Sequence, residues 1–398
     1  MSLDVVGSLF TITLAAAVAP LVVGLLLRSR VAEVVVLLVL GMVIGPEVLG
    51  LATPSDAVDV LRALGLGMLF LLAGYEIDID ELIGPGGRRA GLTWLFSIVL
   101  AIGLTFLLES LGVIGAEVAI AIVLTSTALG TLLPILKDSG LLGSRFGATL
   151  LTHGAYGELG PILAMVLLLS TRGPLASALV VLAFVSVAVL VYVVSWWLSR
   201  RESRLLELVK EGAENSGQLP VRLVMLLLVG LGSVAAELEI DVVLGAFAAG
   251  MILRLLVPEG HEPLELRLEG LAFGFLVPFF FVTSGMAIDP SAVLRKPEVL
   301  VAFVLLILLV RGVPVWRATL IDQPDGHSFT RREALAMGLF ASTGLPIIVA
   351  VTTVAVSSGH LSPENASVLV AGGAVTVLVC PLAGQRLLRG ARLVPAAR

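Results

Sequence analysis

Long apolar runs separated by short polar loops dominate this sequence. A run of about 20 apolar residues is long enough to cross the hydrocarbon core of a bilayer as a helix. In lipid every backbone N–H and C=O must be paired inside the protein, which favours helices. The sequence therefore predicts an all-α polytopic membrane protein. Its 13 predicted transmembrane helices lie at 5–27, 32–49, 59–76, 90–109, 115–136, 146–170, 174–198, 219–237, 241–257, 268–287, 298–317, 333–357 and 365–388.

The composition agrees with a membrane location. Of the 398 residues, 58% are hydrophobic and only 14% are charged, whereas soluble domains have about 25% charged residues. The first run, Val5 to Leu27, lacks the cleavage site of a secretory leader and is expected to stay as the first span. A single cysteine, Cys380, excludes an intramolecular disulfide framework and a cysteine-rich metal site. A net charge of −5 gives no reason to expect a nucleic-acid partner.

The distribution of basic residues predicts the orientation in the membrane. An odd number of spans places the two ends of the chain on opposite sides. If the amino terminus is outside, nineteen lysines and arginines fall in the inner loops and tail, against three outside, Arg172, Arg295 and Lys296. Positive residues are enriched in cytoplasmic loops. We therefore expect the amino terminus outside and the carboxyl terminus in the cytoplasm, in the plasma membrane of a prokaryote.

Two of the predicted spans are interrupted in the same way. "LTSTALGTLLPIL" (124–136) and "FASTGLPIIVAVTT" (340–353) each place a Ser-Thr pair, a glycine and a proline inside an apolar run. They lie seven spans apart, so the two halves of the chain would have opposite orientations. Glycine- and proline-interrupted spans in two inverted halves indicate the substrate site of a transporter. The alternative is that these residues only support packing and kinks.

This pairing predicts an inverted-repeat organisation. We expect a first repeat at 1–171 with its interrupted span at 115–136, followed by a linker span and cytoplasmic loop at 172–218. A second, inverted repeat is expected at 219–388 with its interrupted span at 333–357, followed by a basic cytoplasmic tail at 389–398.

Glu158, within "HGAYGELGPI" (153–162), is the most central ionisable residue at membrane depth. A charge at the centre of a spanning helix costs about 2.5 to 3.5 kcal/mol on insertion scales, so such residues usually face a bundle interior or a wet cavity. Burial favours the neutral, protonated form of a carboxyl group. When ionised, the same oxygens suit a small alkali cation. One carboxyl group can hold a proton or a cation but not both, and this competition is what an exchanger needs. The alternative is a neutral, hydrogen-bonded structural carboxyl.

Small residues share the helix face of Glu158, with Gly154 at i−4 and Ala155 at i−3. They would let another backbone approach closely. We expect the interrupted middle of one of the two broken spans to lie there. Its free carbonyls and nearby hydroxyls would complete a cation shell, the candidate hydroxyls being those of Thr125, Ser126, Thr127, Ser342 and Thr343.

Arg311, in "LLVRGVPVW", is the second charge inside an apolar run. It lies six residues from Arg317, so its side chain can snorkel to the inner surface. Otherwise it would hold a carboxylate or a broken-helix carbonyl in place, or repel cations when the site is empty. His153 lies five residues before Glu158, roughly 140° around the helix. We expect it to be packed or pore-lining, and the alternative is a proton relay. Tyr156 is a weaker accessory candidate.

Several motifs, in order, resemble one family. They are "LGMVIGPEVLG", "LGLGMLFLLAGYEIDIDEL", "LTSTALGTLLPILKDSG", "VLGAFAAGMIL" and "PFFFVTSGMAID". From about Val5 to Leu388 the chain resembles the monovalent cation:proton antiporter superfamily, the sodium/proton exchanger family.

The resemblance implies an inverted-repeat sodium/proton antiporter fold, with two crossed, unwound helices at 115–136 and 333–357. It also implies a homodimer that exchanges Na+ or K+ for H+ by alternating access, without a cofactor or a metal other than the transported alkali cation. Glu158 would be the ion-binding carboxylate and Arg311 a charge-compensating residue. Family members commonly carry an aspartate preceded by Asp, Asn or Gln where this chain has Gly157-Glu158. A single acid favours electroneutral, one-for-one exchange.

Other functions compete with this prediction. A transport-inactive ion or pH sensor, or a channel, would use the same scaffold. An organic-anion symporter of related fold would need a larger polar lining. An intramembrane hydrolase is disfavoured, because the sequence has no H-E-x-x-H zinc pattern and no buried lysine is expected beside a serine. We therefore do not expect an enzyme.

Overall fold

The computed structural model describes residues 3–26, 32–77, 82, 84–111, 115–169, 174–201, 218–238, 241–257, 262–321 and 328–389. All regular elements in these ranges are helical. The predicted cytoplasmic loop falls largely on 202–217 and the predicted basic tail on 390–398, which lie outside the described residues.

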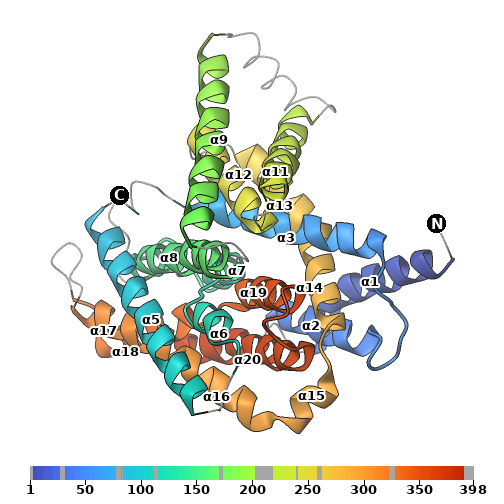
Figure 1. The fold of residues 1–398 in the computed structure, drawn as a ribbon, viewed down its shortest axis with the longest axis vertical. Coiled ribbons are helices and arrows are strands. Elements are labelled where there is room, and N and C mark those ends of the chain that lie inside the picture. The colour runs from blue at the N-terminus through green and yellow to red at the C-terminus, as the bar shows by residue number, and fades with distance from the viewer. Residues whose placement is uncertain are drawn as a thin grey trace. The chain divides into compact units, whose positions relative to one another are not determined.

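The described part of the chain is built from helices (Figure 1). In order they are α1 (Leu3–Leu21), η1 (Val22–Leu26), α2 (Glu33–Ile44), α3 (Asp56–Glu76), α5 (Pro85–Ser110), α6 (Glu117–Leu124), α7 (Leu129–Asp138), α8 (Arg145–Leu168), α9 (Pro174–Arg201), α11 (Leu219–Glu237), α12 (Val242–Leu256), α13 (Glu262–Leu271), η2 (Ala272–Leu276), α14 (Val277–Met286), α15 (Pro290–Arg295), α16 (Pro297–Ile307), η3 (Leu308–Gly312), α17 (Val313–Ile321), α18 (Arg331–Ala341), α19 (Leu345–Ser357) and α20 (Pro363–Leu388). The three η elements are single π-helical turns.

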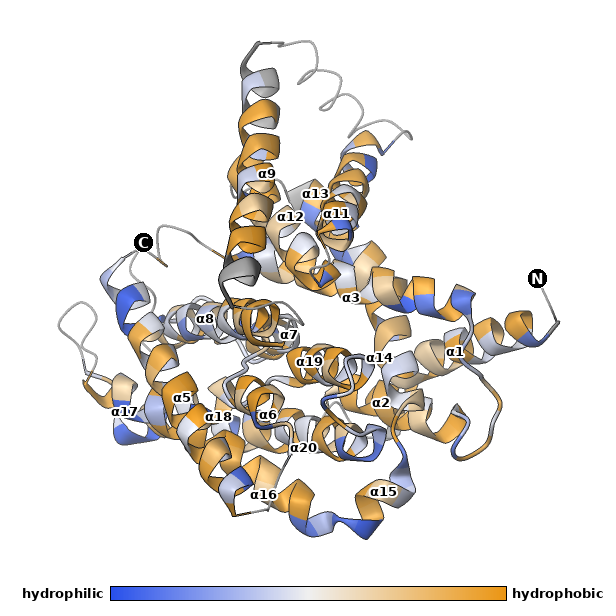
Figure 2. Ribbon diagram, in the orientation of Figure 1, coloured by the Kyte–Doolittle hydropathy of each residue, from blue (hydrophilic) through white to orange (hydrophobic). Residues whose placement is uncertain are grey.

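The helices coincide with the predicted spans. Within the described residues, nine segments are long and apolar enough to cross a membrane. Shorter apolar helices at Glu33–Ile44, Glu117–Leu133, Leu179–Val194 and Val242–Leu256 account for the remaining four predictions. Apolar residues predominate along α5, α16 and α19 (Figure 2). The chain is thus an all-helical membrane protein, as the apolar runs predicted.

The chain divides into two compact units. Unit 1 comprises Met1–Thr53, Ile79–Leu169 and Phe281–Arg398, and unit 2 comprises Pro54–Asp78 and Ser170–Phe280. In unit 2, helices α3 and α12 pack through glycines, since a Cβ atom on Gly74 would collide with the Phe247 carbonyl and one on Gly250 with that of Leu71. Both interrupted spans belong to unit 1. The division of the sequence into two inverted repeats stays a prediction.

A hydrophobic cluster in unit 1 fixes α8 against both interrupted spans. The rings of Phe146 in α8 and Phe340 in α18 meet edge to face, with centroids 5.8 Å apart. Aromatic pairs of this geometry add about 0.5 to 1.5 kcal/mol beyond their buried area. The cluster consists of Leu132, Leu136, Leu141, Phe146, Leu150, Val315, Phe329, Ala336, Met337, Phe340, Ala341 and Leu388.

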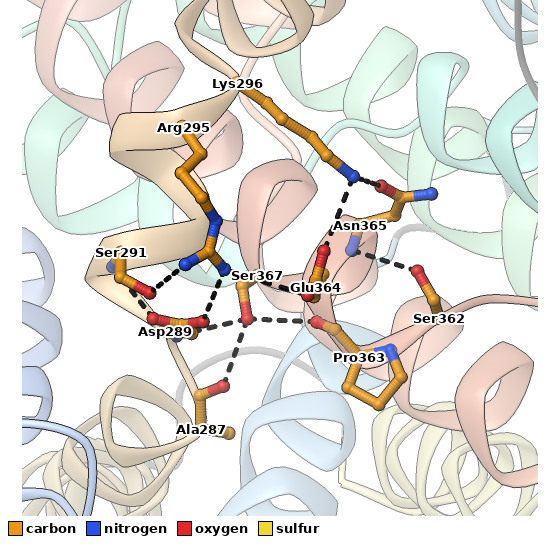
Figure 3. A network of polar contacts seen from close by, with 10 residues as sticks. All are labelled: Ala287, Asp289, Ser291, Arg295, Lys296, Ser362, Pro363, Glu364, Asn365 and Ser367. Carbon is orange, nitrogen blue, oxygen red and sulfur yellow. Dashed lines mark hydrogen bonds and ion pairs between the residues drawn. The ribbon is translucent and has the colours of Figure 1, made fainter.

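A polar network joins the loop around α15 to the start of α20 (Figure 3). Asp289 caps α15 by accepting from the Ser291 N–H at 2.8 Å. Arg295 lies 3.5 Å from Asp289 and 3.7 Å from Glu364, and Lys296 lies 3.6 Å from Glu364. These side chains are partly exposed, so the ion pairs themselves contribute little to stability.

Candidate functional site

The first interruption is a four-residue break between α6 and α7. Helix α6 ends at Leu124 and α7 begins at Leu129. The hydroxyls of Thr125 and Ser126 donate to the carbonyls of Ile122 and Val123, each at 2.8 Å. Serine and threonine hydroxyls compete in this way with backbone donors for helix carbonyls. The same two carbonyls also accept from the backbone N–H groups of Thr125 and Ser126, at 3.1 and 3.2 Å, so the hydroxyls add a second donor to each carbonyl at the end of α6.

In the second interruption, between α18 and α19, side-chain hydroxyls also bind carbonyls at the end of the first helix, α18. Helix α18 ends at Ala341 and α19 begins at Leu345. Ser342 donates to the Gly338 carbonyl and Thr343 to the Phe340 carbonyl, each at 2.8 Å. Pro346 then stands in the first turn of α19, where its missing N–H removes no helical bond.

The two breaks are in direct contact. The Ala128 N–H donates to the Thr343 carbonyl at 2.6 Å, and the Thr127 hydroxyl donates to the Ala341 carbonyl at 2.5 Å. A Cβ atom on Gly344 would collide with the Ser126 hydroxyl. Each break thus satisfies backbone groups that the other leaves without a helical partner. The predicted crossing of two unwound helices is confirmed, and α6 lies beside α19 (Figure 1).

Helix α8 contacts the first break through Gly157. Pro161 lies inside α8 and has no N–H, so it cannot donate to the carbonyl four residues before it. That carbonyl, of Gly157, instead accepts from the Thr127 N–H at 2.8 Å. The sequence predicts that the backbone of a broken span packs against α8 at Gly154 and Ala155. In the structure the Leu129 side chain packs at Gly154, and the backbone of the break lies one residue before the acid, at Gly157.

Glu158 lies at this crossing and is 1% exposed. The backbone N–H of Leu129, the first residue of α7, donates to its carboxyl group. The start of a helix carries partial positive charge and favours an anion. Its other oxygen, Oε2, has no hydrogen-bond partner among the described residues. Glu158 therefore presents one held oxygen and one free oxygen.

Arg311 lies in the π-helical turn η3 and is 0% exposed. Its Nε donates to the Thr127 hydroxyl at 2.9 Å and its Nη2 to the His153 carbonyl at 2.6 Å. Both partners are neutral oxygens. The side chain does not snorkel to the surface. The carbonyl that it binds belongs to the continuous helix α8, whereas we expected one from a broken helix. π-helical turns occur frequently at functional sites.

The two accessory candidates have different surroundings. His153 is 3% exposed, and its Nδ1 has no partner in the described part of the chain. The Tyr156 hydroxyl donates to the Leu82 carbonyl at 3.1 Å, and its ring packs on Gly91 of α5. His153 contributes its backbone to the Arg311 contact, whereas Tyr156 attaches α8 to α5.

The structure thus brings seven of the nine predicted site residues to one crossing, with His153 joined through its carbonyl and Tyr156 packed on α5. Gly157, Pro161 and the N–H of Leu129 were missed. The signal for the first two was in the sequence, because a proline leaves the carbonyl of residue i−4 free and that residue is a glycine.

The hydroxyl groups of the two breaks donate to helix carbonyls, but their oxygen atoms keep lone pairs that can still accept or bind a cation. Together with the Glu158 carboxyl group they offer oxygen ligands of the kind that an alkali cation takes. Within the described residues, no group of three or more His, Cys, Asp or Glu side chains lies close enough together to hold a metal ion.

Comparison with known proteins gives consistent results. Residues 13–390 match the family model "Sodium/hydrogen exchanger, transmembrane". The Na(+)/H(+) antiporter NhaS5 of Synechocystis sp. is 30% identical over 304 residues, which cover 72% of this chain and 41% of that protein. The glutathione-regulated potassium-efflux system protein KefC of Klebsiella pneumoniae is 25% identical, over 83% of this chain and 53% of that protein. The chain thus spans about half the length of these two relatives.

A solved structure shows the same fold. The sodium proton antiporter MjNhaP1 from Methanocaldococcus jannaschii, at pH 8, superposes with a TM-score of 0.63 over 98% of both chains, at 16% sequence identity. This likeness confirms the predicted antiporter fold. The family consists of membrane transporters and not of enzymes. From the match over 13–390, the chain belongs to the sodium/hydrogen exchanger family of monovalent cation/proton antiporters.

Proposed function

We propose that the protein is a secondary antiporter that exchanges Na+ or K+ for H+ and that Glu158 binds the proton and the cation in turn. One observation carries the proposal: Glu158 is 1% exposed, lies where the two helix breaks meet, and has one carboxyl oxygen without a partner. A buried acid in this position must be neutralised, and either a proton or an alkali cation can do so.

The surrounding groups support this exchange. The ionised carboxylate is stabilised by the Leu129 N–H at the start of α7, and the hydroxyls and carbonyls of the breaks supply further oxygen ligands. Protonation removes the charge that attracts the cation and so releases it. Arg311 supplies a positive charge beside the site, where it donates to the Thr127 hydroxyl. A site with one titrating acid favours one-for-one, electroneutral exchange.

The cation and the assembly are parts of the same proposal. The relatives' names include both sodium and potassium, and an oxygen set of this kind accommodates either ion. The excess of basic residues in the predicted inner loops supports an outer amino terminus and a cytoplasmic carboxyl terminus in a prokaryotic plasma membrane. A homodimer, in which one part of each protomer moves against the dimer interface, completes the proposal.

The test is flux measured in proteoliposomes. The purified full chain is reconstituted with an acidic interior and a pH-sensitive dye, and NaCl or KCl is then added outside. Wild-type protein should restore the dye signal with at least one of the cations, and Glu158→Gln should not, although circular dichroism and gel filtration show it folded. Wild-type rates in Glu158→Gln would refute the role of Glu158.

The same vesicles separate the alternatives. Electroneutral exchange should keep its rate when a membrane potential is imposed, whereas a rate that follows the potential would contradict one-for-one stoichiometry. If no alkali cation moved protons through the wild-type protein at any pH, the antiporter proposal would fail, leaving the sensor. Cation flux without coupled proton movement would indicate a channel.

A further inference from the structure

Pro161 creates a free acceptor in the middle of α8. The helix continues through the proline to Leu168, so the Gly157 carbonyl faces a ring nitrogen without hydrogen. Leaving a buried backbone carbonyl unpaired is destabilising, because water cannot reach it. The Thr127 N–H, which the end of α6 leaves without a helical partner, takes the place of the missing donor at 2.8 Å.

Gly157 also leaves room for two side chains. A Cβ atom at this position would lie 2.5 Å from the Thr127 hydroxyl oxygen and 2.5 Å from Nη2 of Arg311. Both atoms already have fixed partners, because Arg311 donates to Thr127 and to the His153 carbonyl. Neither group can therefore move aside without breaking a buried hydrogen bond. Only a residue without a side chain fits here.

We propose that Gly157 and Pro161 are positioning residues that together form a seat on α8 for Thr127, and that the seat holds the Leu129 N–H against Glu158. The inference deepens the proposed function and rests on it, because it assigns the geometry of the same ion site. The seat consists of the Gly157 carbonyl, which Pro161 leaves free, and the space where Gly157 has no side chain.

The coupling follows from chain connectivity. Thr127 and Leu129 are two residues apart on the break, and Gly157 and Glu158 are adjacent on α8. The hydrogen bond between Thr127 and Gly157 therefore sets the register of the break along α8. A shift of that register carries the Leu129 N–H away from the carboxylate. Because a hydrogen bond to the charged form favours that form, the cation would then bind less tightly.

Pro161→Ala separates this role from a structural one. Alanine is strongly favoured over proline inside a helix, so a purely structural role predicts equal or higher thermal stability with an unchanged KM for the cation. If Pro161 instead positions Thr127, Pro161→Ala should show unchanged or higher thermal stability together with a higher KM for the cation. The new N–H at position 161 competes with Thr127 for the Gly157 carbonyl, and the loss of one hydrogen bond corresponds to about tenfold in KM. Pro20→Ala is the matched control, since Pro20 also lies inside a helix, α1, and should leave KM unchanged.

A second variant tests the space at Gly157. Gly157→Ala should also raise KM, because its Cβ displaces Thr127 or Arg311. Gly103→Ala in α5 is the control, because a Cβ there has no neighbour within 4 Å. If Gly157→Ala fails to fold, Pro161→Ala still decides the matter. Wild-type KM values in Pro161→Ala, with exchange intact, would overturn the seat and leave the antiporter standing. Absence of exchange in the wild-type protein would instead overturn the proposed function and the seat with it.

Discussion

Arg311 donates from Nε to the hydroxyl of Thr127 at 2.9 Å, and that hydroxyl in turn donates to the carbonyl at the end of α18. The backbone N–H of Thr127 also donates to the Gly157 carbonyl. Thr127 therefore connects η3, α18 and α8 at one point. Thr127 and Arg311 are both completely buried, so each lost bond leaves a polar group that water cannot reach. The first two predictions follow from this pair.

Thr127→Val should destabilise the protein and abolish exchange. Valine fills the same volume but leaves Arg311 Nε and the Ala341 carbonyl unpaired, at about 1 to 3 kcal/mol each. Thr127→Ser keeps the hydroxyl and should retain most of both properties. Melting temperature in detergent and proteoliposome flux measure the two effects. Equal melting temperatures for the two variants would contradict the central role of the hydroxyl.

Arg311→Lys should reduce exchange although it keeps the positive charge. The guanidinium reaches two oxygens, one on the first break and one on α8, with a rigid fork, and an ammonium group lacks that geometry. Loss of one hydrogen bond to a charged group, about 1.5 kcal/mol, corresponds to roughly a tenfold lower rate. Arg317→Lys, at an exposed position in α17, is the matched control. If both variants transported at the wild-type rate, charge alone would explain Arg311.

Gly344→Ala should disturb the crossing of the breaks. Its Cβ would collide with the side chain of Ser126 and lie 3.0 Å from the Ser126 carbonyl oxygen, so one break must shift. Overpacking of this kind costs about 1 to 3 kcal/mol. Gly103→Ala, with open space around the new methyl group, should be neutral or slightly stabilising. The comparison of their melting temperatures is the measurement, and a lower value for the control would contradict the close contact.

Most of the fold was predictable because the membrane imposes one rule on the whole chain. Apolar length locates each span, and the paired Ser-Thr-Gly-Pro interruptions locate the two breaks, since both effects are local along the sequence. The partners of Arg311 were not predictable in the same way. They depend on which oxygens meet it in three dimensions, and the His153 carbonyl and the Thr127 hydroxyl lie 158 and 184 residues away along the chain.

The contact between α8 and the first helix break was partly predictable. The sequence indicated that small residues beside Glu158 admit another backbone, but helical spacing alone favoured Gly154, on the face of the acid. The structure selects Gly157 because hydrogen bonding decides between two available glycines: only Gly157 has its carbonyl freed by a proline four residues later. The unpaired backbone carbonyl therefore predicts the contact at Gly157, whereas the position of small residues on the face of the acid predicts it, wrongly, at Gly154.

Asp289 gives a pH-dependent prediction outside the spans (Figure 3). Hydrogen bonds from Ser291, with a smaller contribution from the charge of Arg295, hold the pKa of its carboxyl below the ordinary value of 3.8. Because the pKa of Asp289 is lower in the folded protein, the stabilisation is present above about pH 4 and is lost as the pH falls through the folded-state pKa.

The variant Asp289→Asn tests this prediction, because asparagine is also a good helix cap but cannot titrate. Hydrogen exchange of the α15 amides should therefore accelerate between pH 5 and pH 3 in the wild-type protein, beyond the intrinsic pH effect, and much less in Asp289→Asn. Asp56→Asn, an exposed aspartate at the start of α3, should leave the α15 response unchanged. An α15 response equal in wild type and Asp289→Asn would show that Asp289 does not hold this loop.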